Sequence, residues 1–188
     1  MEWDAYQAGD DQVQRLIAQR AYREALEGLV QSYQHLLVRY CTAMLGDAAH
    51  GAEVAQEVFL AAYIAMPRFR QEASLRTWLF AIARKQCLKA LRDRRRRRHL
   101  EEAKQQEIRM SVHRAPPVPL GEDPDALLQR VRQGLDRLGP EERTMLLLRY
   151  ETGLSLVEMA HILGRSEASV RRQLARALQQ LREVLDEG

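Results

Sequence analysis

The chain has 188 residues and a mass of 21.7 kDa, which suits one domain or two small ones and excludes a large multidomain enzyme. Apolar residues make up 46% and charged residues 29%, a composition typical of a soluble globular protein and not of a disordered one. The formal net charge is only +3, but residues 68–114 hold 15 basic and 5 acidic residues, whereas residues 1–67 hold 4 and 9. So concentrated a basic block indicates a polyanionic partner.

The two cysteines, Cys41 and Cys87, lie in apolar surroundings without CxxC spacing or a paired histidine motif. They predict neither a disulfide scaffold nor a zinc site, and they favour a reducing compartment. Apolar runs fall far short of the ~18 residues that span a bilayer, and the acidic residues 1–11 are unlike a signal peptide. We therefore expect a cytoplasmic protein with no membrane insertion, no metal and no cofactor.

Apolar residues at helical spacing predict one or two helices over residues 12–43, which Gly46 ends. A second helix is predicted over residues 49–65. It should end before Pro67, because a proline disfavours helical conformation at the residue directly before it. A third helix is predicted over residues 74–98.

The helix over residues 49–65 has two different faces. The expected core face holds Val54, Ala55, Val58, Ala62 and Ala65. The opposite face mixes carboxylates with large aliphatic side chains, and consists of Glu53, Gln56, Glu57, Leu60 and Ile64. Such a mixture resembles a protein-binding surface, with a plain solvated face as the alternative.

The helix over residues 74–98 also has two faces. Its expected buried stripe holds Leu75, Trp78, Leu79 and Ile82, and another face holds Arg84, Lys85, Leu88 and Arg92. Residues 84–98 include nine basic residues and one acid, and cations of this density bind nucleic acid through the release of condensed counterions. For residues 94–98 alone, a solvated helix end is the alternative.

The loop before this helix carries an aromatic ring between two cations, Arg68, Phe69 and Arg70. A ring in such a position suits stacking on an unpaired base. The alternative is that Phe69 only fills a gap in the core.

Residues 111–125 contain four of the six prolines and are predicted to be a linker. We therefore expect an all-α protein of two small helical domains, over residues 1–110 and 126–188. In the second domain four short helices are predicted, over residues 126–138, 141–150, 156–163 and 166–185, with Ser166 as the N-cap of the last.

The last two of these helices predict a helix-turn-helix motif. Ala160 suits the crossing of the helices, Gly164 suits the positive φ of the turn, and Val170 suits the apolar anchor on the second helix. The side chains expected on the outward face of that helix for a major groove include Ala168, Ser169, Arg171, Arg172 and Arg176. An ordinary helical hairpin with solvated arginines is the alternative.

Together these motifs resemble the bacterial RNA polymerase sigma factors of the extracytoplasmic-function (ECF) type, in the sigma-70 family. Residues 25–98 resemble sigma region 2, through EVAQEVFLAAY at residues 53–63, RFRQEAS at residues 68–74, and TWL and IAR within residues 77–84. Residues 135–185 resemble region 4, through LDRLGPEERTMLLLRYETGLS at residues 135–155. Lys85 stands where the family usually has asparagine.

The resemblance implies a function and a set of partners. It implies that Glu53, Gln56, Glu57 and Leu60 dock on the β′ clamp helices of core RNA polymerase, with the β flap as a further contact. It also implies that Arg68, Phe69, Arg70, Arg84, Lys85 and Arg92 serve the minus-10 element and its melting, and that Ser169, Arg171, Arg172 and Arg176 serve the minus-35 element. An anti-sigma factor is a further implied partner.

Two other functions are alternatives to this one. A stand-alone DNA-binding regulator would use the helix-turn-helix alone and would leave the Glu53 face and the Phe69 loop without a task. An enzyme is disfavoured, because we can assemble no phosphate-binding glycine loop, metal constellation or catalytic triad from this sequence. In a sigma factor, catalysis belongs to the polymerase.

Overall fold

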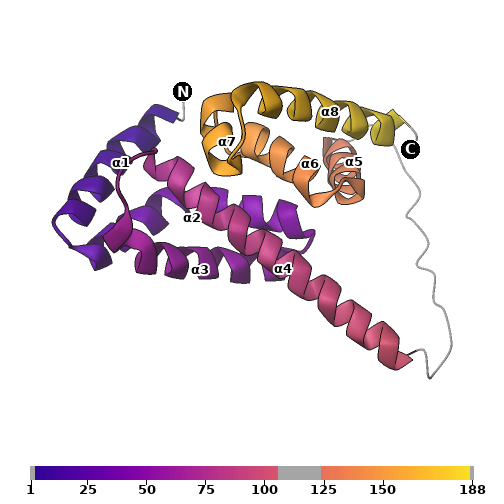
Figure 1. Ribbon diagram of the computed structural model, residues 1–188, viewed down its shortest axis with the longest axis horizontal. Coiled ribbons are helices and arrows are strands. Elements are labelled where there is room, and N and C mark those ends of the chain that lie inside the picture. The colour runs from indigo at the N-terminus through magenta and orange to yellow at the C-terminus, as the bar shows by residue number, and fades with distance from the viewer. Residues whose placement is uncertain (1–2, 106–123, 187–188) are drawn as a thin grey trace.

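The computed structural model describes residues 3–105 and 124–186, and the side chains of residues 9–97 and 129–186. Within these ranges every regular element is helical, which confirms the all-α prediction. Most of the predicted linker, residues 111–125, lies outside the described residues. The chain forms two halves, and the second half lies against α2 and α4 of the first (Figure 1).

The first half consists of α1 (Trp3–Ala18), α2 (Tyr22–Leu45), α3 (Ala48–Ala65), the 3-10 turn η1 (Met66–Arg68) and α4 (Leu75–Gln105). The second half consists of α5 (Pro124–Arg137), α6 (Pro140–Leu146), the π-helical turn η2 (Leu147–Glu151), α7 (Leu156–Leu163) and α8 (Glu167–Asp186).

The predicted break after α2 is a glycine C-cap followed at once by a new N-cap. Gly46 adopts the left-handed conformation, with φ of 69°, and its N–H donates to the Thr42 carbonyl at 2.8 Å. Asp47 then caps α3, its carboxylate accepting from the His50 N–H at 3.1 Å. The region predicted as one or two helices is therefore two, α1 and α2.

Four predicted helix bounds differ from the structure. α1 begins at Trp3, nine residues before the predicted start, and α5 begins at Pro124, within the predicted linker. α4 continues beyond residue 98 to Gln105, because the following residues HLEEAKQ are mostly good helix formers without glycine or proline. The predicted helix over residues 141–150 ends early, at Leu146, and continues as the wider turn η2. There the Thr152 N–H donates to the Leu147 carbonyl, five residues back, at 3.1 Å.

The core of the first half is built around three aromatic rings. Tyr40 and Tyr33 both pack edge-on against Phe80 of α4, with ring centroids 5.4 and 6.5 Å apart. Such pairs contribute about 0.5 to 1.5 kcal/mol each beyond the area they bury. At the crossing of α2 and α3, a Cβ atom on Gly51 would lie 2.6 Å from the Thr42 Cα, so only glycine permits this close approach.

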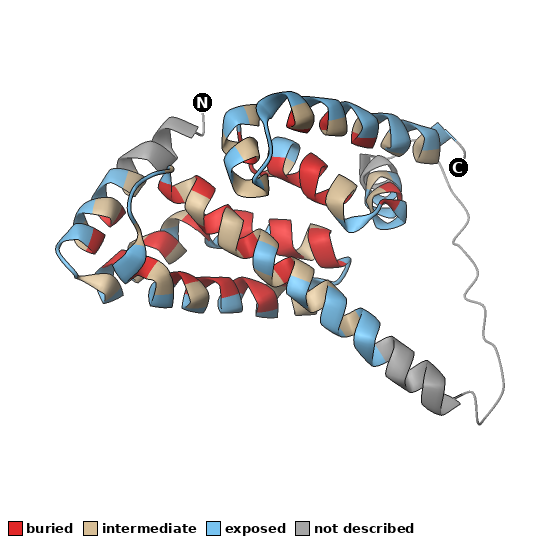
Figure 2. Cartoon of the chain, viewed as in Figure 1, coloured by how far each residue is buried: buried red, intermediate tan, exposed pale blue. Residues whose placement is uncertain are grey.

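The core of the second half joins α6, η2, α7 and α8, through Met145, Leu148, Met159, Val170 and Leu174. These residues belong to the same buried cluster as the core of the first half. Buried residues run along α2 and α6 (Figure 2), and in α6 all of residues 143–146 are buried. The apolar contact between the halves is therefore part of the core of the chain.

Candidate functional site

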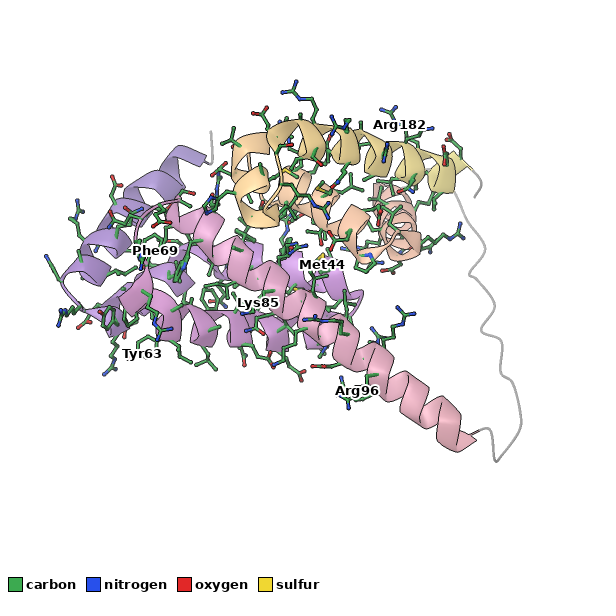
Figure 3. All side chains as sticks on the ribbon, in the orientation of Figure 1. Met44, Tyr63, Phe69, Lys85, Arg96 and Arg182 are labelled. Atoms are coloured by element: carbon green, nitrogen blue, oxygen red, sulfur yellow. The ribbon has the colours of Figure 1, made fainter. Side chains whose placement is uncertain are left out.

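The α3 face, defined as Glu53, Gln56, Glu57, Leu60 and Ile64, is exposed as predicted. Leu60 and Ile64 are 62% and 76% exposed, whereas Val54, Ala55, Val58 and Ala62 on the opposite side are buried. Tyr63, 42% exposed, also lies on α3, and its place seven residues after Gln56 was a signal that could have found it (Figure 3). Three of the five exposed large apolar residues in the described chain therefore lie on this helix.

The Phe69 loop joins η1 to α4 and places its aromatic ring against the protein. The Phe69 ring lies 4.8 Å from the Trp78 ring, centroid to centroid, at an interplanar angle of 44°. Phe69 is half-buried, while Arg68 and Arg70 beside it are exposed. The structure thus leaves both neighbouring cations exposed, and it gives the ring a packing role.

The predicted basic face of α4 lines a groove of about 450 Å³ between α4 and α6. Lys85 and Arg92 are exposed, but Arg84 is half-buried. The Arg84 guanidinium donates to both carboxylate oxygens of Glu141, at 3.1 and 3.3 Å. Sequence reasoning missed this pairing, because the two residues are 57 positions apart. The groove is lined by Arg84, Lys85, Leu88, Leu91, Arg92, Arg95, Pro140 and Glu141.

The arginine run also differs in part from a solvated helix end. The Arg94 guanidinium donates to the Leu45 carbonyl at 3.3 Å, which ties α4 to the last residue of α2. Arg95, Arg96 and Arg97 are exposed, and the side chain of Arg98 lies outside the described ones.

The helix-turn-helix has the predicted local geometry. Ser155 and Glu158 form a reciprocal capping box at the start of α7, and Gly164 ends the helix with φ of 61°. Ser166 caps α8, its hydroxyl accepting from the Ser169 N–H at 3.3 Å.

The buried and exposed sides of α8 are those that the spacing predicts. Its buried residues are Val170, Leu174 and Ala177. Arg171, Arg172 and Arg176 are exposed and Ser169 is half-buried. Arg171 pairs with Glu167 at 2.8 Å, whereas Arg172 and Arg176 have no ion-pair partner among the described residues. Arg165 and Gln173 are hydrogen-bonded beside this face.

A set of polar contacts between the halves was not predicted from the sequence. The buried Arg143 guanidinium donates to the Met44 carbonyl of α2 at 3.0 Å and to the Leu135 carbonyl at 2.7 Å. Burial lowers the pKa of Arg143 from its ordinary value, and the nearby Asp136 carboxylate opposes that shift.

Glu158 of α7 makes a second contact between the halves. Its carboxylate accepts from the Thr77 hydroxyl of α4 at 2.9 Å and lies 3.4 Å from the Arg76 guanidinium. Burial alone would raise the pKa of Glu158, but hydrogen bonds from Ser155 and Thr77 and the charge of Arg76 bring it below its ordinary value. Glu158 is therefore held as a carboxylate.

The two cysteines meet in the core of the first half, with their sulfur atoms 3.6 Å apart as free thiols. The hydrogen bond between them and burial both raise the pKa of Cys41, which disfavours a reactive thiolate. Among the described residues no group of three or more histidine, cysteine or acidic side chains could hold a metal ion. No helix in the described ranges has the length and apolar character to span a membrane.

Two family models match the chain, and they match its two halves. Sigma-70 region 2 matches residues 29–97, and Sigma-70, region 4 matches residues 134–183. The RNA polymerase sigma-H factor of Pseudomonas aeruginosa is 30% identical over 188 residues, covering 95% of this chain and 94% of that protein. The ECF RNA polymerase sigma factor SigD of Mycobacterium tuberculosis is 32% identical over 168 residues, covering 87% and 78%.

Among solved structures, CnrH in complex with the cytosolic domain of CnrY has a similar fold. It aligns with a TM-score of 0.67 and 25% sequence identity, over 93% of this chain and 98% of that one. The alignment therefore includes both halves and the order of their helices.

Proposed function

Because the chain belongs to the sigma-70 family, within its ECF group, it is a sigma factor that directs promoter-specific transcription initiation, and we propose how its surfaces divide that work. The stand-alone regulator considered above has no support, since the family matches cover both halves. RNA polymerase carries out the catalysis, and the surfaces of this chain bind and position.

The α3 face binds core polymerase, at the β′ clamp helices. Its support is the combination of exposed acids with Leu60 and Ile64, which are 62% and 76% exposed. Apolar side chains exposed to this degree become stabilising when a partner covers them, and charged residues at the rim add specificity. In the second half the exposed Tyr150 and Val157 are candidates for the contact with the β flap.

The Phe69 loop and α4 serve the minus-10 element. The exposed Arg68, Arg70, Lys85 and Arg92 offer cations for phosphates, and Arg84 joins them when it is released from Glu141. The Phe69 ring offers an aromatic face for a base that leaves the duplex. Melting therefore draws on both cations and an aromatic surface within one continuous stretch of chain.

The minus-35 element is read by α8. Arg172 and Arg176, which have no ion-pair partner in the part of the chain that the structure describes, can contact DNA directly, while Arg171 would first exchange its pairing with Glu167. A small residue at the start of the helix, Ser169, allows the backbone to approach the groove. An anti-sigma factor is the remaining proposed partner, supported by the relative CnrH, which was solved in complex with the cytosolic domain of another protein.

The observation that carries this assignment is that α3 exposes three of the five large apolar side chains that the described chain leaves exposed, away from the helix-turn-helix. The test is co-elution of the purified chain with core polymerase, followed by run-off transcription on a genomic promoter library. We expect the chain to co-elute with core polymerase. We also expect the transcripts to start at promoters that share a sequence. A chain that binds DNA but neither co-elutes nor supports transcription would overturn the assignment of these surfaces.

A further inference from the structure

Four polar side chains form a series of contacts along one flank of α8. The Arg165 guanidinium, in the turn before α8, lies 3.6 Å from the Glu141 carboxylate of α6 and donates to the Gln173 amide oxygen. The Gln173 amide nitrogen donates to the Ser169 hydroxyl oxygen at 3.3 Å. We call Glu141, Arg165, Gln173 and Ser169 the Ser169 relay. All four residues belong to the second half, so the relay does not depend on how the halves meet.

The arginine of the relay fixes the orientation of the Gln173 amide. A guanidinium carries only hydrogen-bond donors, so the amide must turn its oxygen toward Arg165. The Glu141 carboxylate holds the guanidinium from its other side. The amide nitrogen, which can only donate, therefore faces Ser169.

This orientation decides what the Ser169 hydroxyl offers to DNA. A serine hydroxyl is both a donor and an acceptor, and by itself it serves either kind of base edge. In the relay the hydroxyl oxygen accepts from Gln173, and the backbone N–H of Ser169 is used by the Ser166 hydroxyl. The hydroxyl hydrogen takes part in neither contact, so the side chain is left to act as a donor.

Ser169 also stands at the end of α8 that meets base edges. It is the third residue of the helix, and the N-terminal residues of a recognition helix contact bases in the major groove. The exposed Arg172 and Arg176 follow it on the same side of α8. In the major groove guanine presents two acceptors, O6 and N7, whereas cytosine presents an amino donor. A side chain that only donates therefore favours guanine over cytosine.

We propose that Arg165 and Gln173 are positioning residues for promoter specificity, which make the Ser169 hydroxyl a donor that favours guanine over cytosine at one position of the minus-35 element. This inference rests on the proposed reading of that element by α8. One neutral hydrogen bond of this kind corresponds to a preference of about 2- to 12-fold.

The relay predicts a reversal of preference when the polarity of its middle residue is reversed. In Gln173→Glu the carboxylate presents only acceptors, so it pairs with Arg165 and accepts the hydrogen of the Ser169 hydroxyl. The hydroxyl oxygen is then left to accept from a base, and cytosine becomes the better partner. Relative to Ser169→Ala, the guanine-to-cytosine affinity ratio should be about 2- to 12-fold higher in the wild type and lower in Gln173→Glu.

The test uses holoenzyme, assembled from the full chain and core polymerase, and promoter DNA with each of the four bases at every minus-35 position. Ser169→Ala identifies the position that the hydroxyl reads, as the one whose preference changes. Competition binding then gives the guanine-to-cytosine ratio at that position for each variant. The ratio removes the general weakening that an added negative charge causes on all DNA.

Two further variants separate the relay from charge and from folding. Gln180→Glu makes the same change at an exposed residue two turns further along the same flank of α8, and it should keep the ratio of the wild type. Arg165→Ala leaves the Gln173 amide free to turn, so its ratio should approach that of Ser169→Ala. Circular dichroism checks the folding of every variant.

The other outcomes decide against the proposal. Gln173→Glu that weakens guanine and cytosine alike would leave Gln173 with a general electrostatic role, and an equal shift in Gln180→Glu would mean the same. Unchanged preferences in Ser169→Ala would remove the hydroxyl from base reading. If Gln173→Glu did not fold, an unchanged ratio in Arg165→Ala would overturn the relay. A wild type with no preference at any minus-35 position would contradict the proposed function of α8 itself, a result seen before any variant is compared.

Discussion

The position of Phe69 sets two roles against each other. Its ring already packs on Trp78, a contact of about 0.5 to 1.5 kcal/mol beyond buried area. Stacking on a base is worth about 1 to 3 kcal/mol, so an extruded base can compete for the ring or use its outer face. Packing and base capture are therefore compatible uses of one side chain.

We predict that Phe69→Ala impairs melting more than duplex binding. Holoenzyme with this variant should bind duplex promoter nearly normally and transcribe it poorly, and a template already mismatched across the minus-10 region should restore much of the activity. Run-off yields on duplex and bubble templates measure the difference, with circular dichroism to check folding. A folded variant that is equally defective on both templates would assign Phe69 to another step, and a fully active one would leave it a packing residue only.

The arginines of α8 are distinguished by their partners. Arg171 is engaged by Glu167 at 2.8 Å, whereas Arg172 has no ion-pair partner in the described chain. A bidentate contact from arginine to guanine is worth about 1 to 3 kcal/mol of discrimination, whereas a phosphate contact weakens all sequences alike. Arg172 is therefore the better candidate for reading a base.

We predict that Arg172→Ala reduces the preference for the specific minus-35 sequence over a scrambled one by about 5- to 150-fold, the equivalent of about 1 to 3 kcal/mol. Arg182→Ala, an exposed arginine ten residues further along α8, is the matched control and should leave the preference unchanged. Fluorescence anisotropy of holoenzyme on both DNAs measures it. Equal weakening on specific and scrambled DNA would contradict a base-reading role.

At the scale of elements, α3 has one side for the core of the protein and one side for the proposed contact with polymerase. Its inner side packs on α2 and α4, while its outer side keeps acids and aliphatic residues in water. Exposed charge changes usually alter stability by less than about 0.5 kcal/mol, so the outer side can be changed without unfolding the helix.

We predict that Glu53→Lys with Glu57→Lys abolishes holoenzyme formation and leaves helicity intact. Glu24→Lys with Glu27→Lys on α2 introduces the same charges elsewhere and should leave the affinity for core polymerase near that of the wild type. Native gel shift or co-elution with core polymerase compares the two. An unchanged affinity in the α3 variant would remove this face from the interface.

Helices could be predicted from the sequence where a local signal ends them. The bounds of α7 match the prediction because Ser155 and Gly164 lie directly before and after the helix and mark its two ends. The end of α4 was predicted too early, since an arginine run is not a helix terminator. The pairing of Arg84 with Glu141 could not be predicted, because it depends on how two separately patterned halves meet.

For the candidate site, the sequence indicated which residues face outward but not which of them are engaged. Helical periodicity alone predicts that Leu60 and Arg172 are exposed, and both are exposed in the structure. The contact of Phe69 with Trp78 depends on the path of an irregular loop, which periodicity does not describe. The roles of these residues toward polymerase and DNA stay predictions.

At the scale of the whole molecule, the halves share one buried cluster although they match two separate family models. Residues of α6 and η2 complete the packing around the end of α2, where Arg143 and Thr144 meet Met44. Two units that share apolar contacts and buried hydrogen bonds stabilise each other, so neither is expected to unfold independently.

We predict that the free wild type unfolds in a single transition. Both tryptophans, Trp3 and Trp78, belong to the first half, so fluorescence reports on that half while far-ultraviolet circular dichroism reports on both. In urea the two signals should coincide for the wild type. They should separate for Glu141→Lys with Glu151→Lys, because these changes remove two ion pairs between the halves, Arg84 with Glu141 at 3.1 Å and Arg39 with Glu151 at 2.6 Å. Separate transitions in the wild type would show that the halves are energetically independent.

The close crossing at Gly51 has a consequence for how this chain tolerates mutation. Any side chain there would collide with the α2 backbone, since even a Cβ would lie 2.6 Å from the Thr42 Cα. The helices would have to move apart, which would tilt the α3 face relative to the rest of the chain. A saturation library selected for transcription should therefore retain glycine alone at position 51. Position 51 would then appear essential although Gly51 itself contacts neither polymerase nor DNA.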